Sequence, residues 1–372
     1  MKLALVHDYL IQDGGAERVL RAFAEIWPEA PIFVLYHDRN RWPDFRGRDI
    51  RTSVLQKMPG AINYYRWTLP LMPAATEHHD LGEFDVVVSS ASAFAKGIVT
   101  RPDALHICYC HTPTRYLWTD THSYIKDLRT NKGIKFLLPF VLTSLRMWDR
   151  MSAVRVNKFI ANSQTVAKRI KKYYERESDI IYPPVDCSQF RIADRVGDYY
   201  LAGGRLVAYK RFDLVIEVFN RLKLPLIIFG TGPYEDRLRK MAGKNVKFVG
   251  HISDIEKAKL LSECIAFVHP QLEDFGLLPL EVMASGRPVI AYDRGGALET
   301  IAEGKTGVFF HEQTWEALLD TVLNFKPEAY NPVEIRAWAQ QFDMPHFKEK
   351  MKEYVEGAYA EFQGGARMVK LL

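Results

Sequence analysis

Cysteine is scarce in this sequence, with four residues among 372, and long apolar runs are absent. Cys108, Cys110, Cys187 and Cys264 show no metal-ligand spacing, which predicts reduced core residues. The best uncharged apolar run, residues 136–145, has ten residues, whereas a bilayer span needs about 20. A strand-like run begins at residue 3, with no leader-like segment before it. We therefore expect a cytoplasmic protein without a membrane-spanning helix.

The positive charge is unevenly distributed along the chain. Residues 1–182 carry 26 Lys and Arg against 19 Asp and Glu, whereas the remainder carries 24 against 26. Residues 126–176 alone hold 13 basic and 3 acidic residues, interleaved with aromatic and aliphatic ones. This segment favours peripheral contact with an anionic surface such as the inner face of the cytoplasmic membrane. A core helix with solvated charges is the alternative.

The length exceeds what one hydrophobic core usually supports, so two domains are expected. Short apolar runs alternate with helical patterns, which indicates an α/β fold with parallel sheets covered by helices. The predicted strands are residues 3–7, 32–36, 85–90, 105–111, 159–163 and 180–182, then 199–203, 224–230, 246–250, 264–270, 288–293 and 307–310.

Paired prolines at 183 and 184 prevent either sheet from continuing through this point. We place the domain boundary there, which gives an N-terminal domain of residues 1–182 and a C-terminal domain of residues 183–343. Residues 344–372 form a last helical pattern with a short tail. This helix follows the completed second sheet, so we expect it to pack back on the first domain.

Two carboxylates, Glu273 and Glu281, lie eight positions apart with Gly276 and Pro279 between them. Pro279 suits the first position of a helix, which would put Glu281 in the first turn and Glu273 in the preceding loop. The free amides of that helix start, beside a glycine that permits close approach, form an anion site. The pattern predicts a phosphorylated, polyhydroxylated ligand.

Further candidate residues follow strand ends, where open parallel sheets bind ligands. Gly14 and Gly15 would let backbone amides reach a phosphate, although a simple turn is the alternative. Arg205 and Lys210 could hold a diphosphate from two sides, or belong to a solvated basic loop. His111 ends the strand at 105–111 and would lie at a cleft edge. The remaining histidines show no metal-ligand spacing, and we assign no metal.

These residues occur in an order that resembles a known family. Residues 273–281 match the E-x7-E signature of retaining glycosyltransferases with the GT-B fold. Residues 14–19, 204–210 and 230–233 are similar to motifs of family 4, the glycogen-synthase-like group. The resemblance covers nearly the whole chain.

Within that group, one subset of enzymes is closest in appearance. His7 with Asp8, and residues 110–116, are similar to motifs of bacterial mannosyltransferases that build lipid-linked O-antigen and other surface polysaccharides. The resemblance implies two Rossmann-like domains with parallel sheets facing across a cleft. The first domain would serve the acceptor and the membrane, and the second would bind the nucleotide sugar, with GDP-mannose as the expected donor.

The resemblance also implies roles in the second domain. Arg205 and Lys210 would bind the donor diphosphate, and Glu281 would accept hydrogen bonds from the ribose hydroxyls. Glu273 would hold the transferred sugar and its phosphate. The backbone amides of three residues would assist it: Phe275, Gly276 and Leu277.

In the first domain, the resemblance implies that His111 contacts the sugar near the reacting carbon and that Gly14 and Gly15 approach the phosphate. Arg, Lys and helix amides would replace a metal ion, so no cofactor is expected beyond the nucleotide sugar. Transfer would proceed on one face of the sugar with retention of configuration, to an acceptor carried on a polyprenyl diphosphate. Domain closure would bring His111 toward Glu273.

Other functions fit the sequence less well. A family 4 transferase that uses a UDP-sugar, or a GT-B sugar-nucleotide epimerase, remains open as an alternative. A phosphorylase would need a much longer chain and a lysine for pyridoxal phosphate. A dinucleotide-dependent oxidoreductase would need the full G-x-G-x-x-G pattern, which is missing. A nucleic-acid-binding protein would leave Glu273 and Glu281 without a role.

Overall fold

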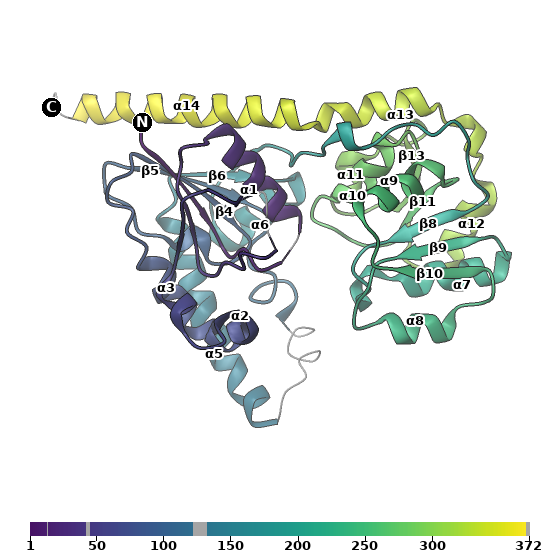
Figure 1. Ribbon diagram of the computed structural model, residues 1–372, viewed down its shortest axis with the longest axis horizontal. Coiled ribbons are helices and arrows are strands. Elements are labelled where there is room, and N and C mark those ends of the chain that lie inside the picture. The colour runs from purple at the N-terminus through teal and green to yellow at the C-terminus, as the bar shows by residue number, and fades with distance from the viewer. Residues whose placement is uncertain (13, 42–44, 122–131, 370–372) are drawn as a thin grey trace. The chain divides into compact units, whose positions relative to one another are not determined.

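The computed structural model describes residues 1–12, 14–41, 45–121 and 132–369 (Figure 1). The chain divides into two compact units. Unit 1 combines Met1–Tyr182 with Lys348–Leu372, and unit 2 is Pro183–Phe347. Helix α14 (Met344–Val369) begins in unit 2 and continues into unit 1. The first part of the basic segment, residues 126–131, and residues 370–372 of the tail lie outside the described residues.

In the described part of unit 1, seven parallel strands form a sheet in the order β3-β2-β1-β4-β5-β6-β7. The strands are β1 (Leu3–His7), β2 (Ile32–Val34), β3 (Ile50–Thr52), β4 (Val86–Ala91), β5 (Leu105–Cys110), β6 (Lys158–Ala161) and β7 (Asp179–Ile180). Its helices include α1 (Gly15–Ile26), α2 (Ala61–Tyr64), α3 (Met72–Glu77), α5 (Lys132–Val154) and α6 (Gln164–Tyr174), with short 3-10 helices η2 (Val54–Lys57), η3 (Tyr65–Leu71) and η4 (Ala95–Gly97). β1, β4 and β5 are buried along their whole length, as expected for a parallel sheet covered on both faces.

In the described part of unit 2, six parallel strands form a second sheet in the order β10-β9-β8-β11-β12-β13. The strands are β8 (Tyr200–Gly203), β9 (Leu226–Phe229), β10 (Val246–Gly250), β11 (Phe267–His269), β12 (Val289–Tyr292) and β13 (Gly307–Phe310). The helices include α7 (Phe212–Leu222), α8 (Glu235–Met241), α9 (Asp254–Glu263), α10 (Leu277–Ala284), α11 (Ala297–Thr300), α12 (Trp315–Asn324) and α13 (Pro332–Ala339).

The predicted α/β architecture with parallel sheets is confirmed, and the differences are local. Most strands are one to several residues shorter than their apolar runs, because the runs continue into buried loops. β3 was missed because this three-residue strand at the sheet edge is partly exposed and includes Arg51 and Thr52. Ser163 caps α6, since its hydroxyl accepts a hydrogen bond from the amide of Val166 at 3.1 Å.

Each sheet has one point at which the strand order reverses direction. In unit 1 the first strand, β1, lies between β2 and β4, and in unit 2 the first strand, β8, lies between β9 and β11. The loops that leave the carboxyl ends of β1 and β4, and of β8 and β11, therefore run to opposite sides. Open parallel sheets bind their ligands at such switch points.

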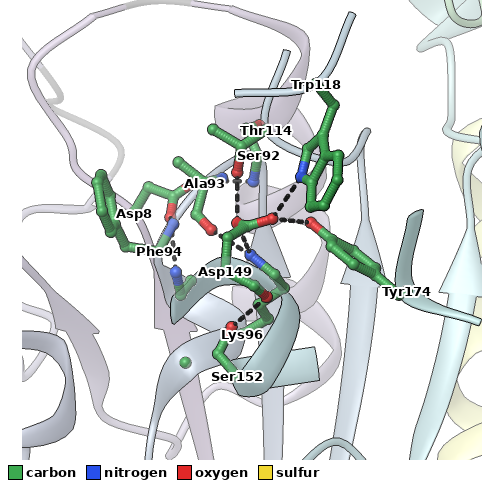
Figure 2. A network of polar contacts seen from close by, with 12 residues as sticks. Asp8, Ser92, Ala93, Phe94, Lys96, Thr114, Trp118, Asp149, Ser152 and Tyr174 are labelled. Carbon is green, nitrogen blue, oxygen red and sulfur yellow. Dashed lines mark hydrogen bonds and ion pairs between the residues drawn. The ribbon is translucent and has the colours of Figure 1, made fainter. Parts of the chain in front are cut away.

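The carboxylate of Asp8 ties the two loops of the unit 1 switch point together (Figure 2). Its oxygens accept hydrogen bonds from four consecutive amides, those of residues 92–95, at 2.7–2.9 Å. Asp8 is buried, so these charge-assisted bonds replace its hydration. They fix the turn that follows β4 against the end of β1.

A buried ion pair continues this network deeper into unit 1 (Figure 2). Lys96 Nζ lies 2.5 Å from Asp149 Oδ1, and the same carboxylate accepts hydrogen bonds from Thr114, Trp118 and Tyr174 at 2.7–2.9 Å. Burial raises the pKa of Tyr174 well above its usual value, so its hydroxyl stays protonated and donates. The pair joins η4, the loop after β5, α5 and α6.

We predict that Lys96→Met destabilises the protein by about 3 kcal/mol or more, because Asp149 would remain buried without its cation. The substitution keeps an unbranched apolar side chain of similar size and removes the ammonium group with its hydrogen bonds. Urea unfolding followed by tryptophan fluorescence measures the change.

The double variant Lys96→Met with Asp149→Asn should recover part of the loss, because the uncompensated charge is removed. Lys2→Ala is the matched control, since the Lys2 ammonium lies on the surface, 3.8 Å from Glu83, and its loss should change little. A Lys96→Met protein as stable as wild type would show that the network does not support the fold.

Candidate active site

A lysine and a glutamate meet at the switch point of unit 2. Lys210 lies on the loop after β8 and Glu273 on the loop after β11. Their Nζ and Oε1 atoms are 2.7 Å apart, and the two side chains are 13% and 20% exposed. The structure thus brings together two residues that are 63 positions apart and places both within reach of a ligand.

Each of the two charged groups lies close to the backbone of a glycine. A Cβ on Gly204 would be 3.2 Å from Lys210 Nζ, and a Cβ on Gly276 would be 3.6 Å from Glu273 Oε2. Gly204 and Gly276 also have φ values of +122° and +90°, a region that other residues rarely adopt. The backbone angles therefore favour glycine at both positions, and the missing side chain of Gly204 leaves room for the Lys210 ammonium.

The motif at residues 230–233, which follows the neighbouring strand β9, packs against the loop that carries Lys210. A Cβ on Gly230 would come within 1.9 Å of the Gly204 carbonyl oxygen, and one on Gly232 within 2.2 Å of the Leu206 carbonyl oxygen. The amide of Leu206 donates to the carbonyl of Thr231 at 2.9 Å. The glycines in residues 230–233 thus let two loops pack backbone to backbone and fix the loop that carries Lys210.

Helix α10 begins earlier than the sequence pattern predicts. Its first residue is Leu277 and Gly276 is its N-cap, so Pro279 is the third helical residue and Glu281 the fifth, beyond the first turn. The prediction of Pro279 at the first position is wrong. Because the amide at the third position has no partner inside a helix, proline is tolerated there as well.

The first turn of α10 follows directly on the loop that carries Glu273. Gly276 has no side chain to cap the helix, and the amides of the first turn carry the positive end of the helix dipole. Phe275 is buried just before this point. An anion placed at this helix start would meet backbone N–H groups and the Lys210 ammonium together.

Glu281 is held by a residue that the sequence analysis missed. Lys257 of α9 places Nζ 3.2 Å from each carboxylate oxygen of Glu281, and the two side chains are only 12% and 5% exposed. The pairing fixes the direction of the Glu281 side chain. No local pattern marks Lys257, because its partner lies 24 positions away on another helix.

Two buried polar side chains at the end of β11 were also missed. His269 and Gln271 are each 1% exposed, and neither the ring nitrogens nor the amide atoms hydrogen-bond to any described residue. Burial lowers the pKa of His269 to about 4, so the ring is neutral at neutral pH. His269 Nε2 lies 4.0 Å from Glu273 Oε2, which adds an unsatisfied polar group beneath the ion pair.

Arg205 lies on the same loop as Lys210 but is exposed, and within the described residues its guanidinium makes no ion pair or hydrogen bond. Arg211, by contrast, is bound to Asp213 and Gln313.

The described residues contain no group of three or more His, Cys, Asp or Glu side chains arranged to hold a metal.

The predicted glycine pair of unit 1 lies at the start of α1. Gly14 is the N-cap and Gly15 the first helical residue. A Cβ on Gly14 would lie 2.8 Å from Glu17 Oε2, and the Glu17 side chain is buried. Its other oxygen lies 3.9 Å from His7 Nε2. Glu17 thus occupies space beside the glycines, a contact that the sequence did not reveal.

His111 follows β5 and joins the same polar group in unit 1. Its Nε2 lies 2.8 Å from Ser90 Oγ, and Ser90 Oγ lies 3.0 Å from His7 Nδ1. Burial, with a smaller contribution from His7, lowers the pKa of His111 to about 3. The imidazole is therefore neutral at physiological pH.

Two Rossmann-like units in succession, each with its polar residues at the switch point, define the GT-B class of fold. Two family models match the chain: "Glycosyltransferase Family 4" over residues 13–189 and "Glycosyl transferases group 1" over residues 196–330. The chain belongs to glycosyltransferase family 4, as the sequence motifs predict.

Similar proteins agree with this assignment. The chain is 26% identical over 265 residues to the mouse alpha-1,3/1,6-mannosyltransferase ALG2, covering 60% of this chain and 61% of the relative. It is 29% identical over 164 residues to O-antigen chain mannosyltransferase C of Escherichia coli, covering 40% and 43%. Anabaena HepE, solved in complex with UDP, shares the fold with a TM-score of 0.72 at 17% identity, covering 96% of this chain and 100% of that one.

Proposed function

We propose that this protein transfers mannose from GDP-mannose to a lipid-linked saccharide in the synthesis of O-antigen or a related surface polysaccharide. The observation that carries the proposal is the Lys210–Glu273 ion pair at the open N-terminus of α10. It combines a cation, free amides and a carboxylate. A sugar diphosphate needs groups of these three kinds.

The cationic side of the site would bind the donor diphosphate. Lys210 pairs with Glu273 on the loop that leads into α10, and the exposed Arg205 lies on the same loop as Lys210. As the bond to the sugar breaks, negative charge builds on the departing nucleotide. Fixed cations and amides stabilise such charge without reorganising, and we propose that they do so here without a metal ion.

The two carboxylates would hold the rest of the donor. Glu273, near the amides of Phe275 and Gly276, would accept hydrogen bonds from sugar hydroxyls. Glu281 would accept them from the ribose, as an ionised carboxylate can. Lys257 supports this role because its contacts to both oxygens fix the direction of the Glu281 carboxylate.

The proposed chemistry takes place on one face of the sugar. The bond from the anomeric carbon to the diphosphate oxygen breaks, and a bond to the acceptor hydroxyl oxygen forms on the same side. The acceptor proton passes to the departing phosphate oxygen, so the products are GDP and the glycosylated acceptor with configuration retained. Glu273 orients and stabilises in this scheme and forms no covalent bond.

The choice of mannose rests on the relatives, several of which are named mannosyltransferases. The choice of guanine rests on the family resemblance of the sequence motifs, for which GDP-mannose is the expected donor. Because the solved relative HepE is named as a UDP complex, a UDP-sugar donor is the second candidate. A sugar-nucleotide epimerase would form product without an acceptor, which separates it from both.

We predict that GDP-mannose raises the melting temperature of the protein and that Lys210→Ala removes this stabilisation. Turnover should fall by about 10²- to 10³-fold, because one fixed donor to the developing charge is lost. A thermal-shift screen of nucleotide sugars followed by a GDP-release assay with a polyprenyl-linked acceptor provides both measurements.

Lys244→Ala is the matched control, since Lys244 is an exposed lysine of the same unit and its loss should leave both measurements unchanged. Stabilisation by UDP-sugars alone would overturn the donor, and full activity of the Lys210→Ala protein would overturn the site.

The acceptor side of the proposal is a contact between unit 1 and an anionic membrane. None of the helices in the described ranges is long and apolar enough to cross a bilayer. Unit 1 instead exposes large apolar side chains on two neighbouring elements, which are η3 with its N-cap residue Tyr64, and α5. We call these side chains the apolar face: Tyr64, Trp67, Leu71, Phe136, Leu137 and Phe140, each at least 51% exposed.

One core cluster joins the two elements of the apolar face. Tyr65 and Leu69 of η3 pack in the same cluster as Leu142 and Leu145 of α5, and Figure 1 shows α2 and α3 beside α5. This corrects part of the sequence interpretation: α5 is both a core helix and a surface one, since its two sides differ in burial. The exposed Arg66 adds positive charge on η3, and aromatic side chains with nearby cations suit the membrane interface.

We predict that the double variant Trp67→Ser with Phe140→Ser weakens binding to phosphatidylglycerol vesicles by about tenfold or more, because two large apolar groups no longer enter the interface. Vesicle co-sedimentation at low and high salt measures the affinity. Ile255→Ser is the control, since Ile255 is 85% exposed in unit 2. Equal binding by the double variant, or no binding by wild type, would contradict the membrane contact.

A further inference from the structure

A chain of hydrogen bonds runs from His7 through Ser90 to His111 at the switch point of unit 1. His7 Nδ1 lies 3.1 Å from the Ser90 carbonyl oxygen and 3.0 Å from Ser90 Oγ. Ser90 Oγ lies 2.8 Å from His111 Nε2. His7 and Ser90 are buried. The family resemblance implies a role for His111 at the sugar, and it implies none for Ser90 or for the His7 ring.

The direction of the first bond follows from the chemistry of the acceptor. A backbone carbonyl only accepts, so His7 Nδ1 carries a hydrogen whether the His7 ring is neutral or protonated. The same nitrogen faces Ser90 Oγ, which therefore accepts from it rather than donating to it. Glu17 lies on the Nε2 side of the ring, 3.9 Å from that nitrogen. This is beyond hydrogen-bond distance, so Glu17 does not compete with the Ser90 carbonyl for the hydrogen of the ring.

The direction of the second bond follows from the first. Ser90 Oγ already receives a hydrogen from His7, so its own hydroxyl hydrogen needs an acceptor. His111 Nε2 is the other hydrogen-bond partner of this oxygen within the described residues. If Nε2 itself carried a hydrogen, the Ser90 hydroxyl would lose its acceptor in a buried position, which is unfavourable. Nε2 is therefore the acceptor.

We propose that Ser90 and His7 are positioning residues that hold neutral His111 in the tautomer with its proton on Nδ1. His111 Nδ1 makes no hydrogen bond to any described residue, so this N–H is available to a ligand. A neutral N–H donor binds an oxygen atom of a sugar hydroxyl or a phosphate without adding charge. That last step rests on the proposed function, whereas the tautomer does not.

The tautomer can be read directly by nuclear magnetic resonance. Long-range proton–nitrogen correlation spectra of the full chain with ¹⁵N-labelled histidine report which ring nitrogen is protonated, and His111→Asn identifies the signals of His111. We expect protonated Nδ1 and unprotonated Nε2 in the wild type. In Ser90→Ala the Nε2–H form should become populated, because its acceptor bond is gone.

The neighbouring residue on β4 offers a matched control. Ser89 Oγ lies 2.8 Å from His106 Nε2, and both residues are fully buried. Ser89→Ala thus deletes an equivalent buried serine–histidine bond, and it should leave the His111 signals unchanged. Ser90→Thr, which keeps the hydroxyl, should restore the wild-type pattern.

The His7 end of the chain is tested in the same way. His7→Asn keeps an N–H group at the position of Nδ1 and should preserve the His111 tautomer, whereas His7→Phe should not. Wild-type His111 with its proton on Nε2 would overturn the proposal. So would a Ser90→Ala protein in which the His111 tautomer does not change.

Kinetics test whether the tautomer matters to the reaction. We expect Ser90→Ala to lower kcat/KM for the nucleotide sugar by about tenfold, the effect of one hydrogen bond made in the transition state. Ser89→Ala should stay within about twofold. Equal losses in the two variants would indicate a structural effect only and would contradict a positioning role. If no nucleotide sugar is turned over by wild type, the proposed function fails while the spectra still decide the tautomer.

Discussion

Asp8 is the residue on which the functional edge of unit 1 depends. A buried carboxylate must be compensated, and four amides of the turn after β4 compensate it. That turn leads directly to Lys96, whose pairing with Asp149 joins α5, α6 and the loop after β5. His7 and Ser90, which border this turn, are thereby held in one position, and through Ser90 so is His111.

The loops at the switch point of unit 2 are held in a different way. Glycines let the loops pack backbone to backbone, and the charges of Lys210 and Glu273 remain partly exposed. A partly exposed pair has lost less hydration than a buried one, so a diphosphate can replace one partner at lower cost. We propose that the rigid network of unit 1 positions groups on the acceptor side. The more exposed ion pair of unit 2 would bind the donor.

The sequence predicted features that depend on local pattern. Apolar runs located the buried strands, and the motifs located Lys210 and Glu273, because glycine turns and charged residues stand at strand ends. Contacts set by sheet topology could not be predicted. Ser90 meets His7 from 83 positions away, and Lys257 meets Glu281 across two helices. The start of α10 was misplaced because proline is tolerated at the third helical position as well as at the first, so Pro279 does not fix the helix start.

The central claim is that the protein transfers mannose with retention of configuration. The most direct test is the anomeric configuration of the product formed from GDP-mannose labelled with ¹³C at the anomeric carbon and a polyprenyl-linked saccharide acceptor. The one-bond carbon–proton coupling of the new linkage distinguishes the two anomers. The account predicts an α-linked mannose, the configuration of the donor. A β-linked product would contradict it.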